Sequence, residues 1–264
     1  MTTPALKLDN IAKIFGGLRA IDGVSFEVAP RQIFGLIGPN GAGKTTAFNC
    51  ISGVYTPEQG TISFFGQSIA GRPPSQIAAL GIARTFQNIR LFGDMTVLEN
   101  VMVAGHATIS FGPLAAMFRL RKQAEEQERL ATRAYELLRI FELDSLAGEF
   151  SKSLPYGSQR KLEIARALML NPKLLLLDEP AAGMNSREAD SLKNQIRWLR
   201  DTFDLTIVLV EHNMQVVMNV CEQVHCVDHG QTIASGEPLH VQNHPAVRTA
   251  YLGADVDEST LRQS

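Results

Sequence analysis

The chain has 264 residues, 45% hydrophobic and 20% charged, which is enough to bury a sizeable core and argues against a disordered chain. Its 25 basic and 27 acidic side chains give a formal net charge of -2, so no overall field draws it to nucleic acid or anionic lipid. Its longest apolar runs, residues 174–177 and 205–210, are far shorter than the ~20 residues that span a bilayer. Residues 1–7 lack a secretory-signal pattern, so we expect a cytoplasmic protein.

The three cysteines, Cys50, Cys221 and Cys226, are odd in number and form no C-x-x-C pair. Their neighbours are apolar, which is typical of reduced thiols in a core. The alternative is a zinc site at Cys221, His225 and Cys226, but it needs a fourth ligand that the surrounding sequence does not offer.

Two kinds of strand are predicted. Residues 24–28 and 61–64 alternate apolar and polar side chains, which indicates half-buried antiparallel strands near the N-terminus. Residues 32–37, 173–177 and 205–210 are almost continuously apolar, which suits strands covered on both faces. Because helical segments separate these three buried strands, the sequence predicts a parallel sheet.

Helices are predicted between and after these strands. Residues 96–143 alternate charges of both signs with Leu and Ala, as on a solvated helix face. Residues 161–170 repeat apolar side chains at 3–4 spacing, just after a glycine, and Asn171-Pro172 ends that helix. Residues 228–230 read as a turn between two short strands, and residues 254–264 as a polar, frayed tail.

A phosphate-binding motif follows the first buried strand. Its pattern, G-x-x-x-x-G-K-[ST], follows a predicted strand and precedes a predicted helix, which is the context that a P-loop requires. The residues of this cradle are Gly38, Pro39, Asn40, Gly41, Ala42, Gly43, Lys44, Thr45 and Thr46. In such a loop main-chain N–H groups converge on phosphate oxygens, Lys44 reaches the β- and γ-phosphates, and Thr45 binds Mg2+. The alternative is a chance glycine-rich turn, which the strand context disfavours.

Two carboxylates end the second buried strand, at the sheet edge where ligands of open α/β sheets bind. Asp178 suits a Mg2+ partner, and Glu179 can orient and polarise an attacking water. Alone, an Asp-Glu pair after a strand is usually a loop start, but the P-loop makes it a strong signal. Lys44 and Asp178 are 134 residues apart (178 minus 44), so a helical arm is expected between them.

His212 follows the third buried strand by two residues, which brings an imidazole to the same edge as Asp178. There it can donate a hydrogen bond to the γ-phosphate. A surface histidine without a role is the alternative.

Together these motifs resemble the ABC transporter ATPase family, over residues 6–253. The resemblance implies that Phe15 stacks on adenine, that Gln87 is the Q-loop glutamine and a Mg2+ ligand beside Thr45 and Asp178, and that His212 is the switch histidine. ATP and Mg2+ are the implied cofactors. By residue type alone, Phe15 could be ordinary strand packing and Gln87 a solvated loop residue.

The segment 154–161 resembles the family signature LSGGQ but departs from it. Pro155 and Tyr156 replace the usual serine and first glycine, so contacts to a γ-phosphate fall to Gly157, Ser158 and the helix N-terminus. The D-loop ends in Asn185 where the family usually has aspartate.

These departures, with the segments 15–20, 83–87, 162–168 and 251–253, are similar to the branched-chain amino acid importer subfamily and its larger, livG-type ATPase. The implied fold is an α/β P-loop NTPase: a mostly parallel core sheet, an N-terminal antiparallel β subdomain and an inserted α-helical subdomain at about 88–160. The tail is 254–264.

The resemblance also implies the partners and the location. They are transmembrane permease subunits, a second ABC ATPase subunit in a homo- or heterodimeric sandwich, and indirectly a periplasmic or extracellular solute-binding protein, at the cytoplasmic face of the cell (inner) membrane. Nucleic acid is not expected as a partner.

Two other functions are weighed against this one. A GTPase or small-molecule kinase could use the same P-loop, but no N-K-x-D guanine motif is present. A non-transport ABC ATPase could act as an ATP-gated interaction module on ribosomes or DNA. The near-neutral charge argues against nucleic acid, and one cassette without a long coiled coil argues against the chromosome-type ATPases.

Overall fold

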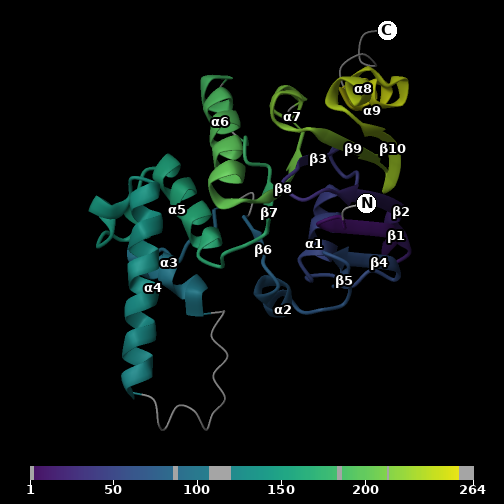
Figure 1. Cartoon of the computed structure of the whole chain (residues 1–264). Coiled ribbons are helices and arrows are strands. Elements are labelled where there is room, and N and C mark those ends of the chain that lie inside the picture. Colours follow the sequence, from purple (N-terminus) through teal and green to yellow (C-terminus); the bar gives the residue numbers. More distant parts are fainter. Residues whose placement is uncertain (1–2, 86–88, 107–119, 183–185, 213, 256–264) are drawn as a thin grey trace. The chain divides into compact units, whose positions relative to one another are not determined.

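The computed structural model describes residues 3–85, 89–106, 120–182, 186–212 and 214–255 (Figure 1). The chain forms two compact units. The first combines Met1–Ile77 with Lys173–Ser264, and the second is the continuous segment Ala78–Pro172. The helical arm expected at about 88–160 falls within this second, longer segment.

The N-terminal sheet of the first unit is antiparallel, with strand order β2-β1-β4-β5. Its strands are β1 (Leu6–Phe15), β2 (Leu18–Val28), β4 (Gln59–Phe64) and β5 (Gln67–Ser68). Leu6 pairs with Val28 on one side and with Phe64 on the other. Side chains along β2 alternate: Val24, Phe26 and Val28 are buried and the residues between them are exposed. The predicted antiparallel strands are confirmed.

The strands that this unit contributes to the second sheet are mostly parallel and follow one another in the order β10-β9-β3-β8-β7. The strands are β3 (Ile33–Ile37), β7 (Leu174–Asp178), β8 (Thr206–Glu211), β9 (Gln223–Asp228) and β10 (Gln231–Gly236). Every residue of β3, β7 and β8 is buried, as their apolar runs predict. Among these five described strands β10 pairs antiparallel with its hairpin partner β9, which confirms the turn expected at residues 228–230.

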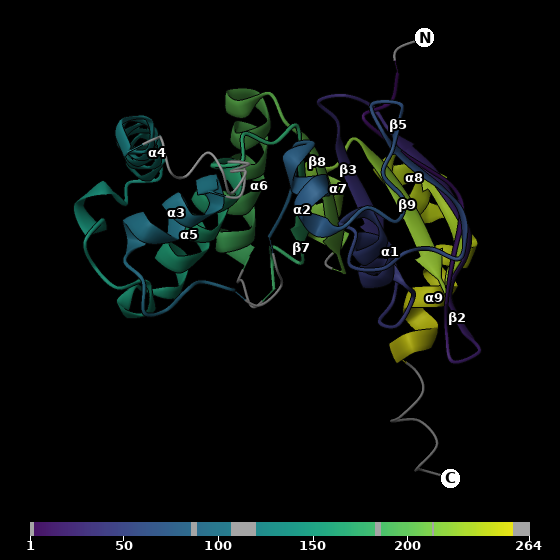
Figure 2. The ribbon, with the colours of Figure 1, turned by 90° about the horizontal axis from the view of Figure 1, so that it is seen from below.

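Helices of the first unit contribute to its core. They are α1 (Lys44–Ile51), α6 (Ser186–Phe203), α7 (Met214–Val220), α8 (Pro238–Asn243) and α9 (Pro245–Asp255). Phe48 and Ile51 of α1 are fully buried. Figures 1 and 2 show α8 and α9 beside the β9–β10 hairpin. Since α9 continues to Asp255, it extends two residues into the tail that was expected from residue 254.

The three cysteines lie in this unit, where each is buried and free. Burial raises the pKa of the Cys50 thiol to about 11 and that of Cys226 to about 12. The thiols therefore stay protonated at neutral pH and act as small apolar side chains.

The second unit is built mainly on three packed helices, α3 (Val97–His106), α4 (Leu120–Ile140) and α5 (Tyr156–Leu168). Its shorter elements are β6 (Ile82–Arg84) and the 3-10 turns η2 (Asp144–Leu146) and η3 (Ser151–Ser153), and α2 (Pro74–Ala79) crosses the boundary in the sequence. A capping box begins α3: Thr96 Oγ1 accepts from the Glu99 N–H at 3.2 Å, and Glu99 accepts from the Thr96 N–H at 2.8 Å. Helix α5 begins at Tyr156, before Gly157 and not after it as expected, because Pro155 already has the extended backbone of an N-cap.

No helix in the described part of the chain is both long enough and apolar enough to cross a membrane.

A buried ion pair in the second unit generates a stability prediction. Arg160 and Glu163, one turn apart on α5, are 2.9 Å apart, with 9% and 1% of their side chains exposed. Replacing Glu163 with Ala leaves a buried guanidinium without this carboxylate. The free energy of unfolding, measured with urea, should therefore fall by about 3–5 kcal/mol.

The matched control is Lys152→Ala, which breaks the exposed Lys152–Asp94 pair of the same unit. It should leave stability almost unchanged. If the free energy of unfolding fell equally in both variants, burial would not be what makes the Arg160–Glu163 pair important for stability.

Candidate nucleotide site

The site lies at one edge of the parallel sheet, where three strands end side by side. Strand β8 pairs in parallel with β3 and with β7, so Ile37 lies opposite Glu211 and Asp178 lies opposite Val210. The next residues along the chain are the P-loop after β3, Glu179 after β7 and His212 after β8. The register therefore brings together the three segments that the sequence singled out.

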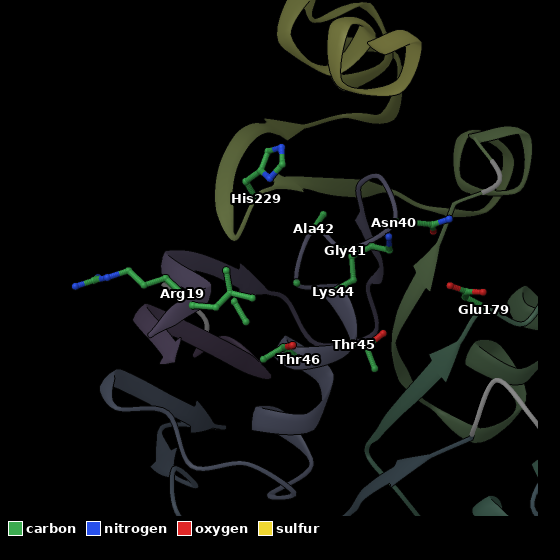
Figure 3. A pocket seen from close by; sticks show the side chains of 12 residues that line it. Arg19, Asn40, Gly41, Ala42, Lys44, Thr45, Thr46, Glu179 and His229 are labelled. Carbon is green, nitrogen blue, oxygen red and sulfur yellow. The ribbon is translucent and has the colours of Figure 1, made fainter. Parts of the chain in front are cut away.

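A pocket of about 300 Å³ opens at this edge (Figure 3). It is lined by Leu18, Arg19, Ala20, Asn40, Gly41, Ala42, Gly43, Lys44, Thr45, Thr46, Glu179 and His229. Seven of the nine P-loop residues are among them, while Gly38 and Pro39 form the start of the loop. In Figure 3 Glu179 lies across the pocket from Thr46.

Two glycines allow the P-loop to lie against its surroundings. A Cβ at Gly38 would lie 2.0 Å from the main-chain oxygen of Val227, and one at Gly43 would lie 2.4 Å from that of Ala20. Both residues have positive φ, 151° and 100°. The Gly230 N–H also donates to the Ala42 oxygen at 3.0 Å, so the β9–β10 turn holds the loop from the side. Main-chain packing thus requires glycine at both positions.

The Lys44 side chain is held by main-chain carbonyl groups of the P-loop. Its Nζ donates to the oxygens of Gly38 at 2.6 Å and of Pro39 at 2.8 Å. An ammonium group has three N–H donors, so a further bond can go to a phosphate oxygen. Burial lowers the pKa of Lys44, and the negative charges of Glu179, Asp178 and Glu211 oppose this shift.

The donor groups fit a hard divalent cation. The Thr45 hydroxyl lines the pocket in the first turn of α1, and Asp178 ends β7 with 5% of its surface exposed. Hydroxyl and carboxylate oxygens are ligands that Mg2+ accepts alongside phosphate oxygens and water.

Glu179 and His212 face each other. His212 Nδ1 lies 3.6 Å from Glu179 Oε2, and their side chains are 52% and 15% exposed, respectively. The Glu179 backbone has φ 45°, a left-handed conformation that a non-glycine residue seldom adopts. Its N–H donates to the Val210 oxygen at 2.9 Å and its own oxygen accepts from Ala182 at 3.1 Å. These bonds fix the backbone of Glu179, which lines the pocket.

Phe15 is not among the residues that line the pocket. It ends β1 with 40% of its surface exposed, and its ring lies edge-on to Tyr55 with centroids 5.1 Å apart. The Lys13 ammonium lies 5.2 Å from the Phe15 centroid, and Lys13 is anchored to Glu58 at 2.6 Å. Stacking of Phe15 on adenine stays a prediction.

The signature segment belongs to the second unit and starts α5. Gly157 is exposed and Ser158 half-buried in the first turn of this helix, whose N-terminal N–H groups have no partners within the helix. Gln159 is turned back, since its side-chain amide donates to the Leu154 oxygen at 2.9 Å. The trans contact of Gly157 and Ser158 stays a prediction.

A family model for ABC transporters matches residues 21–182, from β2 to the loop after β7. The chain belongs to the ABC transporter family. A second model, for branched-chain amino acid ATP-binding cassette transporters, matches residues 231–257. The expected family and ATPase activity are confirmed.

Individual ABC proteins match almost the whole chain. It is 42% identical to the high-affinity branched-chain amino acid transport ATP-binding protein LivG of Escherichia coli K12, over 96% of this chain and 99% of that protein. It is 41% identical to BraF of Pseudomonas aeruginosa, a protein of the same description, with the same coverage. A crystal structure of MJ1267 in its ADP conformation, an ATP-binding cassette of an ABC transporter, superposes with a TM-score of 0.82 at 33% identity, covering 96% and 100% of the two chains. This similarity confirms the predicted fold class.

Two residues of the ABC cassette that were assigned from sequence lie outside the described residues. These are the Q-loop glutamine, Gln87, and the last D-loop residue, Asn185. Their roles stay predictions.

Sequence reasoning missed other residues at this edge of the cassette. Arg19 and His229 line the pocket: Arg19 pairs with Asp22 at 2.6 Å, and His229 is at the tip of the β9–β10 turn with its side chain 95% exposed. Glu211 is fully buried directly before His212. The charged residue Glu211 at the end of an apolar strand was a visible signal, whereas His229 had none because only the fold brings its turn to the P-loop.

The contact between Gly38 and Val227 generates a prediction. Replacing Gly38 with Ala forces a methyl group into a main-chain oxygen between paired strands, so the P-loop must shift. We expect MgATP affinity, measured by calorimetry, to fall at least about tenfold, equal to about 1.4 kcal/mol.

Gly66→Ala is the matched control, because Gly66 also has positive φ (78°) but its Cβ would meet only Thr3 at 3.6 Å. It should lower stability by about 1 kcal/mol and leave affinity unchanged. Unchanged affinity in the Gly38 variant would contradict the role given to this contact.

Proposed function

We propose that the chain is the ATP-hydrolysing subunit of an importer for branched-chain or related amino acids. The observation that carries this proposal is the joint match of a cassette at residues 21–182 and a subfamily segment at residues 231–257. The proposal is supported by 41–42% identity, over nearly the whole chain, to two ATP-binding proteins named for high-affinity branched-chain amino acid transport. We further propose that it works as a peripheral subunit at the cytoplasmic face of the cell (inner) membrane.

The P-loop binds the triphosphate in this proposal. Main-chain N–H groups of residue 38 and residues 40–46 and the N-terminus of α1 offer donors and partial positive charge, and Lys44 adds a full charge. Thr45, Asp178 and Gln87 would hold Mg2+, which neutralises charge on the phosphate oxygens when bound. Phe15 would stack on the adenine, a contact worth ~1–3 kcal/mol with little base selectivity.

Hydrolysis is assigned to Glu179 and His212. The Glu179 carboxylate accepts a hydrogen bond from the attacking water and orients it along the line of the terminal P–O bond. The His212 imidazole donates to a γ-phosphate oxygen. Their 3.6 Å separation supports a joint role, because one water and one phosphate oxygen can then be bound side by side.

Transport would be coupled through partners. A second cassette, identical or related, would place its Gly157, Ser158 and α5 N-terminus against the γ-phosphate in a sandwich dimer. Permease subunits would dock near residues 88–92, where Phe92 is 49% exposed and lies 5.8 Å from the Arg166 guanidinium. A periplasmic or extracellular solute-binding protein would act indirectly by delivering the cargo.

Replacing Glu179 with Gln tests the assigned base. Because the amide cannot accept a proton, steady-state ATP hydrolysis should fall by about 10²–10⁴-fold while ATP affinity is retained. The exposed Glu27→Gln, on β2, is the control and should hydrolyse normally. Unchanged turnover in the Glu179 variant would remove this residue from its role.

Replacing Lys44 with Ala tests the phosphate contact. Loss of a charge-assisted hydrogen bond should weaken MgATP binding by about 1.5–3 kcal/mol, measured by calorimetry. Lys7→Ala is the control: Lys7 is a half-buried residue on β1 that does not line the pocket, so this variant should bind MgATP normally. Equal affinity in wild type and the Lys44 variant would contradict the P-loop assignment.

Purification of the full chain from its own membranes in mild detergent tests the transport function. We expect integral permease subunits to co-purify, and the complex in liposomes to hydrolyse ATP faster when its solute-binding protein and Leu, Ile or Val are added. Recovery of ribosomes alone would favour the non-transport ABC ATPase instead.

A further inference from the structure

A buried carboxylate joins the two catalytic segments. Glu211 is the last residue of β8, and its side chain is completely buried. Its Oε1 accepts from the main-chain N–H of Ala181 at 2.8 Å, and its Oε2 accepts from the main-chain N–H of His212 at 3.2 Å. One oxygen therefore binds the segment after Glu179, and the other binds the residue that carries the imidazole.

This bridge begins where the sheet ends. The last hydrogen bond between β7 and β8 is the one from the Glu179 N–H to the Val210 oxygen. Beyond it the two strands end and the pairing between them stops. The next main-chain N–H groups beyond the ladder are those of Ala181, after β7, and His212, after β8. Both donate to the Glu211 carboxylate and not to a main-chain oxygen of the neighbouring strand. The Glu211 carboxylate thus links the segments that follow β7 and β8, just beyond the last hydrogen bond of the ladder.

The bridged segments hold the two side chains that face each other. Glu179 is two residues before Ala181 and has the left-handed φ of 45°, and its Oε2 lies 3.6 Å from His212 Nδ1. A change in the position of either loop would alter that distance. Both loops are hydrogen-bonded to one carboxylate, and these charge-assisted bonds limit such movement.

We propose that Glu211 is a positioning residue for ATP hydrolysis: its two carboxylate oxygens set the Glu179 loop and the His212 loop at a fixed separation. It does not contact the nucleotide itself. The inference rests on the proposed roles of Glu179 and His212.

The main test is Glu211→Gln in the full chain. Glutamine has the same length, but its NH2 group cannot accept a hydrogen bond, so one of the two loops loses its anchor. We expect kcat to fall at least about tenfold, while the ATP Kd measured by calorimetry and KM change less than about threefold. A loss confined to kcat separates positioning from nucleotide binding.

Glu211→Asp is the second variant and also covers the case in which the glutamine variant does not fold. Aspartate keeps the charge but is one carbon shorter, so it cannot reach both loops. Positioning predicts a similar loss of kcat, whereas full activity in this variant would mean that only the buried charge matters and would overturn the proposal.

Thr206→Val is the matched control for a purely structural role. Thr206 starts the same strand, is 2% exposed, and its hydroxyl accepts from the main-chain N–H of Arg31 at 3.0 Å, at the end of β8 away from the site. The Thr206→Val substitution removes a part-buried side-chain acceptor of a main-chain N–H on the same strand, so it should lower the midpoint of unfolding without lowering kcat at 25 °C. Equal kcat losses in Thr206→Val and Glu211→Gln would overturn the proposal.

A double-mutant cycle with His212→Ala completes the test. If Glu211 acts through His212, adding Glu211→Gln to His212→Ala should reduce kcat by much less than it does in the wild type. Additive losses would contradict the proposed connection. If Glu179→Gln keeps full turnover, the proposed catalytic function fails; if that variant is inactive but Glu211→Gln is fully active, only the present inference fails.

Discussion

The parallel pairing of β8 with both β3 and β7 is the constraint on which the site depends. Neighbouring strands are about 4.8 Å apart, so three adjacent strand ends span about 10 Å, comparable with a triphosphate chain. The register puts Ile37 opposite Glu211 and Asp178 opposite Val210, and the loops that follow begin at the same level. This register is what brings Lys44 and Glu179 to one pocket, although about half of the chain separates them in the sequence.

Charge explains why the edge suits a triphosphate bound with a cation. The negative charges of Glu179, Asp178 and Glu211 each raise the pKa of the Lys44 ammonium, against the effect of burial. The single positive charge of Lys44 does not offset the repulsion between these three carboxylates and an anionic ligand. In the proposed site, main-chain N–H groups, the N-terminus of α1 and a divalent ion at Thr45 and Asp178 would supply the missing positive charge.

Much of this arrangement could be predicted from local patterns. Continuous apolar runs revealed β3, β7 and β8, alternation revealed the antiparallel strands, and motifs at the strand ends located Lys44, Asp178, Glu179 and His212. The start of α5 was misplaced because Gly157 looked like a helix boundary, whereas the extended Pro155 is the N-cap.

What could not be predicted depends on contacts between distant segments. The packing of the Gly38 backbone on Val227 and the approach of His229 to the pocket follow from the β9–β10 hairpin and not from any local pattern. The bridging of two loops by Glu211 also requires knowledge of which main-chain N–H groups remain beyond the sheet ladder.

The most direct test of this account is a crystal structure of the Glu179→Gln variant with MgATP. The account predicts that the triphosphate lies along residues 38–46, with Lys44 Nζ at a terminal phosphate oxygen and Mg2+ between Thr45 and Asp178. A nucleotide bound elsewhere on the chain, with Lys44 still directed only at the carbonyls of Gly38 and Pro39, would contradict it.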